Sequence, residues 1–198
     1  MEREDETYSR QDFWTTSKNK QLNFLQHIHT LLGINGRAAV VMPDNVLFEG
    51  GAGETVRRAL MEKCDLHTIL RLPTGIFYAQ GVKANVLFFD KKSASPTRWT
   101  KQVWIYDART NAHYTLKNNP LRREHLAEFV ELFHPKRRHE RRTTWSEENP
   151  EARWRVYGAD EIWARDKKNL DIFWIKDQSL ENADLDIAPD ILAQEIAD

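Results

Sequence analysis

Three short, largely apolar runs constrain the fold of this chain more than any other feature. They occupy residues 37–42, 66–72 and 84–89. A helical pattern, with Val56, Ala59 and Leu60 on one side, separates the first two runs, whereas only a loop separates the last two. The first two strands are therefore expected to be parallel with a right-handed crossover, and the last two antiparallel. Strands and a helix in this order predict an α/β sheet.

Weaker patterns flank this region. A helix is expected near the start, with Thr15–Ser17 as candidate N-caps and with Leu22, Leu25 and Leu32 on one face. Residues 103–106 are predicted to add an edge strand or a hairpin.

The second half of the chain is less regular. Residues 123–133 predict a helix that turns four apolar side chains inward, namely Leu126, Phe129, Val130 and Phe133. Beyond His134 we expect a tail with little periodicity, apart from a final helix after Pro189.

Composition narrows the class of protein. With 40% hydrophobic and 30% charged residues, the chain has enough apolar material for a core. A net charge of −1 neither requires nor excludes a nucleic-acid partner. Cys64, the single cysteine, rules out an internal disulfide and is expected to be a buried, inert thiol. The sequence has neither a signal-peptide pattern nor about 20 consecutive apolar residues, so we predict a cytoplasmic protein.

Motifs for self-contained catalysis are missing from the sequence. Residues 50–53 (Gly-Gly-Ala-Gly) lack the pattern of a nucleotide-binding loop. We expect them to form a turn into a helix, with a phosphate cradle as the less favoured alternative. His27 and His29 lie two apart and point to different helix faces, and no metal-binding or serine-hydrolase motif occurs.

Four segments in order resemble the C-terminal part of the modification (M) subunit of Type I restriction-modification systems, which are adenine-N6 DNA methyltransferases. They are residues 19–28, 36–48, 70–77 and 81–89. Residues 106–111 and 119–121 are also similar to that family. The resemblance implies the second half of a Rossmann-like methyltransferase sheet. Residues 37–42, 66–72 and 84–89 would be its strands 5, 6 and 7, followed by a helical and irregular tail.

The resemblance also implies two regions with different roles. Residues 1–120 would belong to the catalytic domain, and residues 121–198 would form a tail that docks onto a partner. The family binds S-adenosylmethionine through a glycine motif and holds adenine with an Asn-Pro-Pro-Phe/Tyr motif, and neither occurs in this sequence. S-adenosylmethionine is therefore the cofactor expected for the complete subunit. This chain alone is expected to lack catalytic residues, to bind no cofactor and no metal, and to be inactive.

One residue would contact the target base. Methylation of adenine requires the base to leave the duplex and enter a pocket. The resemblance implies that Phe77 stacks on this base, whereas from the residues alone Phe77 packs under its own loop. Other candidates for the pocket or for DNA contact are Pro43, Asp44, Tyr78, Gln80, Lys83 and Asn85. For Asn85, a bond within the sheet and a role in the pocket both remain open.

The remaining candidates concern partners. A basic cluster can contact DNA phosphates or simply form a solvated face: Lys136, Arg137, Arg138, Arg141 and Arg142. The tail is rich in tryptophan (Trp145, Trp154, Trp163 and Trp174), which predicts either docking onto a partner or a core of its own. The resemblance implies DNA, the specificity (S) subunit, a second M subunit and the restriction (R) subunit as partners. The alternative function is a non-catalytic module that binds the specificity subunit or DNA.

Overall fold

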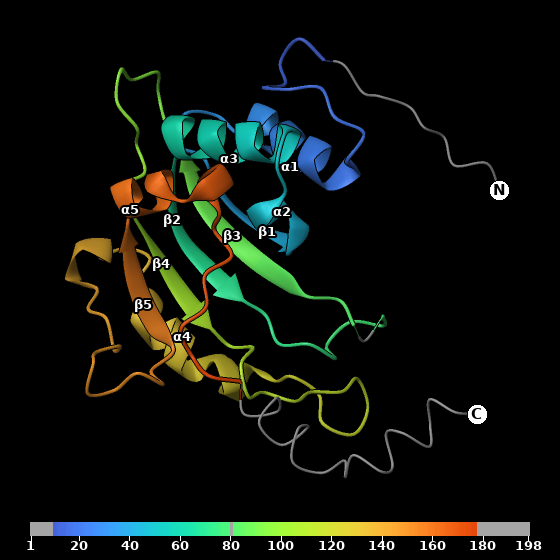
Figure 1. Ribbon diagram of the computed structural model, residues 1–198, viewed down its shortest axis with the longest axis vertical. Coiled ribbons are helices and arrows are strands. Elements are labelled where there is room, and N and C mark those ends of the chain that lie inside the picture. Colours follow the sequence, from blue (N-terminus) through green and yellow to red (C-terminus); the bar gives the residue numbers. More distant parts are fainter. Residues whose placement is uncertain (1–9, 80, 178–198) are drawn as a thin grey trace, which may run out of the picture.

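A five-stranded mixed sheet forms the centre of the molecule (Figure 1). The computed structural model describes residues 10–79 and 81–177. The strands are β1 (Arg37–Pro43), β2 (Cys64–Arg71), β3 (Ala84–Lys91), β4 (Gln102–Asp107) and β5 (Trp154–Gly158). Their order across the sheet is β1-β3-β2-β4-β5.

Strand direction confirms the predicted α/β class. β3 pairs antiparallel with both β1 and β2, so the expected antiparallel pair is confirmed. β1 and β2 run in the same direction, as expected, but they are not neighbours because β3 lies between them. Since β4 is parallel to β2, three strands end at the same edge of the sheet. This carboxyl edge is where α/β folds usually place their ligands.

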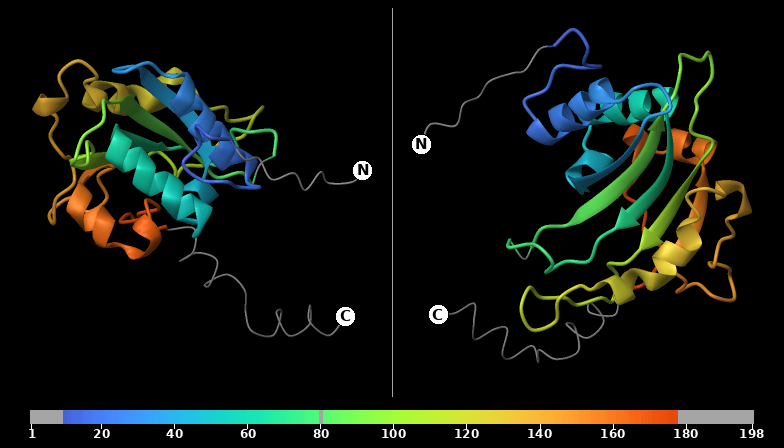
Figure 2. Two further views of the ribbon diagram at one scale, coloured as in Figure 1. Left: turned by 90° about the horizontal axis from the view of Figure 1, so that it is seen from above. Right: turned by 180° about the vertical axis from the view of Figure 1, so that it is seen from behind.

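Short helices connect and cover the strands. The α-helices are α1 (Lys20–Leu31), α2 (Asn45–Phe48), α3 (Ala52–Lys63), α4 (Ala127–Phe133) and α5 (Ala159–Ala164). Three 3-10 turns complete the described part: η1 (Arg123–Leu126), η2 (Arg138–Glu140) and η3 (Asp166–Lys168). In the view from above, the sheet lies between α1, α3 and α5 on one side and α4 on the other (Figure 2).

α1 begins later than the sequence indicated. The prediction that residues 15–17 cap it is wrong, because the Asn19 side chain accepts hydrogen bonds from the backbone N–H groups of Gln21 and Leu22. Ser17 lies two residues before this cap, and its hydroxyl accepts a hydrogen bond from the Asn19 N–H at 2.9 Å. The predicted apolar face is confirmed for Leu22 and Leu25, which are buried.

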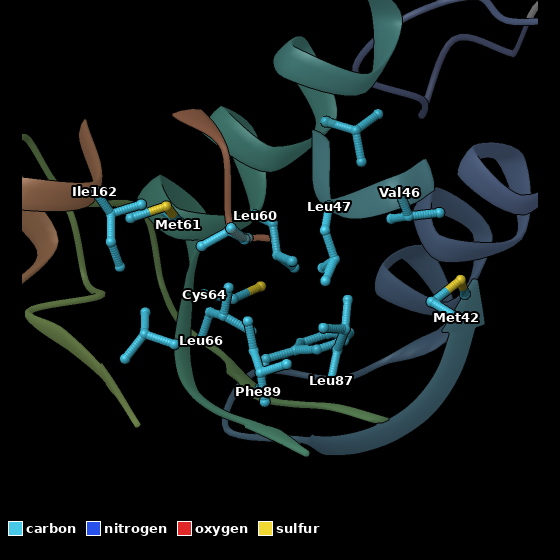
Figure 3. Packing of buried hydrophobic residues seen from close by; sticks show 14 of the residues in the cluster. Met42, Val46, Leu47, Leu60, Met61, Cys64, Leu66, Leu87, Phe89 and Ile162 are labelled. Carbon is cyan, nitrogen blue, oxygen red and sulfur yellow. The ribbon is translucent and has the colours of Figure 1, made fainter. Parts of the chain in front are cut away.

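The larger core lies under α1, α3 and α5. It includes Met61, Leu66, Leu87 and Phe89, whose side chains converge between the helices and the strands (Figure 3). Cys64 is fully buried in this core, and burial raises the pKa of its thiol to about 12. The expected burial is confirmed, and the raised pKa keeps the thiol protonated at neutral pH, so its inertness stays a prediction.

The second core is aromatic and lies under α4. Phe129 packs against Tyr106 and Trp154, with ring centroids 5.4 and 6.3 Å apart. The helix expected over residues 123–133 is divided into η1 and α4. The prediction that Val130 faces inward is wrong, since its side chain is 56% exposed. A helix turns about 100° per residue, so with Phe129 against the sheet its neighbour points to solvent.

The tail takes part in the sheet more than its sequence suggested. β5 pairs with β4 and occupies the edge, so β4 is an inner strand and not the predicted edge strand. Trp154 is fully buried, while Trp163 and Trp174 pack against the larger core. Trp145 is half-buried, with the guanidinium of Arg155 3.5 Å from its ring centre.

For Trp154, Trp163 and Trp174 the structure supports the alternative of a core within the chain. The helix expected after Pro189 lies outside the described residues. No helix among the described residues is long and apolar enough to cross a membrane.

Candidate functional site

The loops at the carboxyl edge of the sheet bring most of the predicted site residues together. Residues 73–83, which we call the Phe77 loop, connect β2 to β3, and residues 108–122 follow β4. Asp44 comes directly after β1. Figure 1 shows both loops projecting from the same end of the sheet.

Asp44 forms an ion pair with Arg109. The two guanidinium nitrogens Nη1 and Nη2 lie 2.7 and 2.9 Å from the two carboxylate oxygens. Asn85, which is fully buried, donates from Nδ2 to Asp44 Oδ1 at 2.7 Å. Burial opposes ionisation of Asp44, but the hydrogen bonds and charge of Arg109 outweigh it and lower the pKa of the carboxyl. Asp44 is therefore a charged, bonded group at neutral pH.

Arg109 also reaches the two ends of the Phe77 loop. Its Nε donates to the Leu72 carbonyl at 3.0 Å, and Nη2 donates to the Ala84 carbonyl at 2.8 Å. With its side chain only 9% exposed, Arg109 lies beneath the edge of the sheet. For Asn85, the structure shows a bond to the end of a neighbouring strand.

Arg109 and Asp107 were missed by the sequence analysis as site residues. The Asp107 carboxylate accepts from the N–H groups of Arg109 and Thr110 at 2.8 and 2.7 Å, so it orders the turn that aims Arg109. A signal was present, because both residues lie in the segment 106–111 that resembles the methyltransferase family. The sequence did not reveal their role, which depends on three strand ends meeting.

The aromatic and basic candidates lie on or near the Phe77 loop. Phe77 is half-buried against the aromatic core, whereas Tyr78 is 96% exposed. Lys83 has an exposed side chain, and its backbone carbonyl accepts from the Asp44 N–H at 3.1 Å. Pro43 is half-buried at the end of β1 and pairs with Ala84. Gln80 lies outside the described residues.

Gly75 allows the Phe77 loop to approach the loop after β4. Its φ angle of +80° lies in the left-handed region, and a Cβ at this position would be 1.9 Å from the Tyr114 carbonyl oxygen. Only glycine avoids both the strain and the clash. The two loops therefore touch through their backbones.

The predicted basic cluster separates into internal and exposed parts. Arg138 bonds Asp65 and Asp90 at 3.0 and 2.8 Å. Arg141 is 3% exposed and donates to the Phe133 carbonyl and to Thr68 Oγ1. Burial lowers the pKa of Arg141 to about 10, which still leaves it charged at neutral pH.

These contacts remove Arg141 from the candidate phosphate contacts, because its donors face protein oxygens. Arg138 is held by two carboxylates and is a poor candidate for the same reason. Lys136, Arg137 and Arg142 are exposed and remain candidates.

Residues 50–53 form the expected turn into α3, which begins at Ala52. A Cβ on Gly53 would lie 3.1 Å from both Arg57 Nη1 and Glu49 Cβ, so the glycine makes room for the protein's own side chains. Arg57 fills this space and donates to the Val46 and Glu49 carbonyls at 3.0 and 2.7 Å. The protein's own side chains fill the space beside Gly53, which favours the expected turn over the alternative of a phosphate cradle. Among the described residues, no group of three His, Cys, Asp or Glu side chains can hold a metal ion.

Comparisons with known proteins agree on one family. The family model described as N-6 DNA Methylase matches residues 1–172. The chain is 46% identical to the Type I restriction enzyme EcoKI methylase subunit of Escherichia coli (strain K12), over 90% of this chain and 39% of that protein. The StySPI methylase subunit of Salmonella potsdam gives the same identity and coverage. The chain thus spans about 39% of the length of these relatives.

Solved structures give the same result. The crystal structure of the EcoKI M protein matches with a TM-score of 0.73 and 43% identity, covering 94% of this chain and 42% of that one. A chain from a study of assembly and conformational transition in a type I R-M system matches with a TM-score of 0.64 and 28% identity. It covers 90% of this chain and 39% of the other.

Proposed function

Because this chain belongs to the N-6 DNA methylase family, we propose that it acts within the modification subunit of a Type I restriction-modification system. The complete subunit would transfer a methyl group from S-adenosylmethionine to the N6 amino group of adenine in DNA. The observation that carries this proposal is the 46% identity to Type I methylase subunits over 90% of the chain. The chain corresponds to about 39% of such a subunit, so the activity belongs to the larger assembly.

Within that subunit, the carboxyl edge would form one wall of the adenine pocket. A flipped base needs an apolar or aromatic surface to stack on, and Phe77 offers one from a loop at this edge. Tyr78 and Lys83 are exposed beside it and would contact the DNA. Pro43, Asp44 and Asn85 would support the pocket from the strand ends and not touch the base, since their polar groups are bonded to protein partners.

S-adenosylmethionine would be bound by parts of the complete subunit other than this chain. The family's glycine and Asn-Pro-Pro-Phe/Tyr motifs do not occur in the sequence, and the glycine turn at residues 50–53 packs against Arg57. We therefore expect the isolated chain neither to bind this cofactor nor to methylate DNA.

The proposed partners are DNA, the specificity subunit, a second modification subunit and the restriction subunit, and the proposed location is the cytoplasm. Lys136, Arg137 and Arg142 would supply phosphate contacts, and their contribution would weaken as salt rises. Residues 121–198 would supply the surface that docks onto a partner.

A chimera tests the proposal. The matching region of the EcoKI methylase subunit is replaced by this chain and co-expressed with the EcoKI specificity subunit, and transfer of labelled methyl to adenine is measured. We expect transfer, and about 5- to 150-fold less with Phe77→Ala, because stacking is worth ~1–3 kcal/mol per base. Phe77→Trp keeps the stacking surface and is the matched control.

A chimera that binds S-adenosylmethionine and the specificity subunit but transfers no methyl would overturn the proposal. That result would instead favour a non-catalytic interaction module.

A further inference from the structure

We infer that Arg109 is a positioning residue that fixes the Phe77 loop, so that Phe77 is already in place when a base arrives. This inference rests on the proposed function, because it assigns a purpose to the placement of Phe77. Arg109 would not touch the base or the cofactor, since it lies beneath the edge of the sheet.

The first argument is the position of its hydrogen bonds. Leu72 and Ala84 are the residues on either side of the Phe77 loop, and the Leu72 N–H donates to the Ala84 carbonyl at 3.0 Å. Arg109 donates to the carbonyls of both residues, at 3.0 and 2.8 Å. One side chain thus holds both ends of the loop.

The second argument is that Arg109 is itself fixed. Asp44 accepts from both of its terminal nitrogens, and this two-point geometry sets the plane of the guanidinium. The Asp44 N–H in turn donates to the carbonyl of Lys83, the last residue of the loop. The end of β1 is therefore tied to the same loop through both its side chain and its backbone.

The third argument is a contact within the Phe77 loop, away from its two ends. The Gly75 backbone packs against the Tyr114 carbonyl so closely that no side chain fits between them. The segment after β4 therefore holds the Phe77 loop at its ends through Arg109 and near its first turn through Tyr114. The loop's later described residues, including Tyr78, are exposed, so beyond the packing of Ile76 and Phe77 on the aromatic core few other contacts order the loop.

A fixed loop matters for stacking. A ring contributes most to binding when its position is set before the ligand arrives, because ordering a free loop costs conformational entropy. The chain contains no second side chain, among the described residues, that bonds both Leu72 and Ala84 carbonyls.

Hydrogen exchange on the chain itself provides the first test. We compare the native chain with Arg109→Gln and Arg109→Lys, and use Arg98→Gln as the matched control, because Arg98 pairs with Asp160 away from the loop. In Arg109→Gln we expect exchange of the hydrogen-bonded amides at the loop, those of Leu72, Val82 and Asp44, to accelerate about tenfold or more, from the loss of several charge-assisted hydrogen bonds. Amides of Ile69 and Leu87 in the core should be unchanged. Arg109→Lys should lie between, since an ammonium keeps the charge but not the fork.

Two outcomes would overturn the inference. Unchanged exchange in the loop would show that Arg109 does not hold it. Equal acceleration in the loop and the core would show that Arg109 serves only global stability.

The second test uses the methylating chimera and DNA with 2-aminopurine at the target adenine. Its fluorescence is quenched by stacking, so Phe77→Ala should give a brighter complex than the native chimera. Arg109→Gln and Gly75→Ala should give the same bright signal and a lower kcat, with affinity for S-adenosylmethionine unchanged. A dim complex with a normal kcat in both variants would contradict the inference. The exchange experiment does not depend on methylation, so failure of the proposed function would be seen separately as an inactive native chimera.

Discussion

Replacing Asp44 with asparagine tests the ion pair at the carboxyl edge. The substitution keeps the size of the side chain and one acceptor oxygen, but it removes the negative charge that faces Arg109. Arg109 would remain almost buried, with its side chain 9% exposed, and would lack a counter-ion. The structure therefore predicts a loss of stability that exceeds the loss of a surface pair.

The magnitude follows from the burial of both groups. Breaking a buried pair by removing one partner costs about 3–5 kcal/mol. The Asp44 side chain is 15% exposed, and the amide oxygen of the substituted side chain would still accept one hydrogen bond, so we expect about 2–3 kcal/mol. Urea denaturation at pH 7 measures this difference between the native chain and Asp44→Asn. The control is Asp160→Asn, whose carboxylate is 94% exposed and should change stability by less than about 0.5 kcal/mol.

The stability that Asp44 contributes should change with pH in a defined direction. The folded-state pKa of Asp44 is lowered below 3.8, so its contribution is present above the unfolded pKa and is lost as pH falls through the folded pKa. The difference between the native chain and Asp44→Asn should be constant from about pH 5 to 8 and shrink below about pH 4. A difference smaller than about 0.5 kcal/mol at pH 7, or one that grows with acid, would refute this account.

Three further predictions concern the core, the thiol and the cofactor. Trp154→Ala should destabilise the chain by about 3–5 kcal/mol in urea denaturation, because the indole is fully buried between the sheet and α4; a loss under about 1 kcal/mol would contradict that packing. Cys64 should not react with a thiol reagent at pH 8 until the chain is unfolded, since burial raises its pKa to about 12, and rapid labelling of the folded chain would count against this. Calorimetric titration of S-adenosylmethionine into the isolated chain should give no heat at high micromolar ligand, whereas one-to-one binding would reveal a cofactor site in this chain.

Hydrophobic patterning predicted β1, β2 and β3 but not β5. β2 and β3 are inner strands and bury most of their side chains, as expected for a sheet covered on both faces, whereas β1 is an apolar run that lies at one edge of the sheet. β5 was missed because Arg155 interrupts a strand of only five residues. A short edge strand with a polar, outward-facing residue is difficult to distinguish from a loop in the sequence.

The sequence indicated candidate site residues but not the hydrogen bonds between them. The expected carboxyl end of a parallel strand drew attention to Asp44, and the structure places Asp44 in hydrogen-bond contact with Asn85, another candidate. The role of Arg109 could not be predicted, because its acceptors lie up to 65 residues away from it in the sequence. Such a contact depends on the order of strands across the sheet, which local patterns do not specify.

The arginines show why a basic sequence is weak evidence for DNA contact. Arg57 donates to the carbonyl of Lys168, and Arg71 donates to the carbonyl of Ile172 at 2.8 Å. Arg141 joins the segment after α4 to Thr68 in β2. Each of these side chains is at most 3% exposed and connects segments at least 73 residues apart in the sequence.

Arg57 and Arg71 satisfy backbone carbonyls after α5 and so attach the tail to α3 and to the sheet, while Arg141 bonds the carbonyl at the end of α4 and Thr68 of β2. In the proposed function, positive charge for DNA would therefore come from the exposed side chains near the carboxyl edge and on the loop after α4. It follows that neutralising Lys136 or Arg137 should reduce the salt dependence of DNA binding and leave the stability of the fold unchanged. Neutralising Arg141 should instead reduce the stability of the fold and leave the salt dependence of DNA binding unchanged.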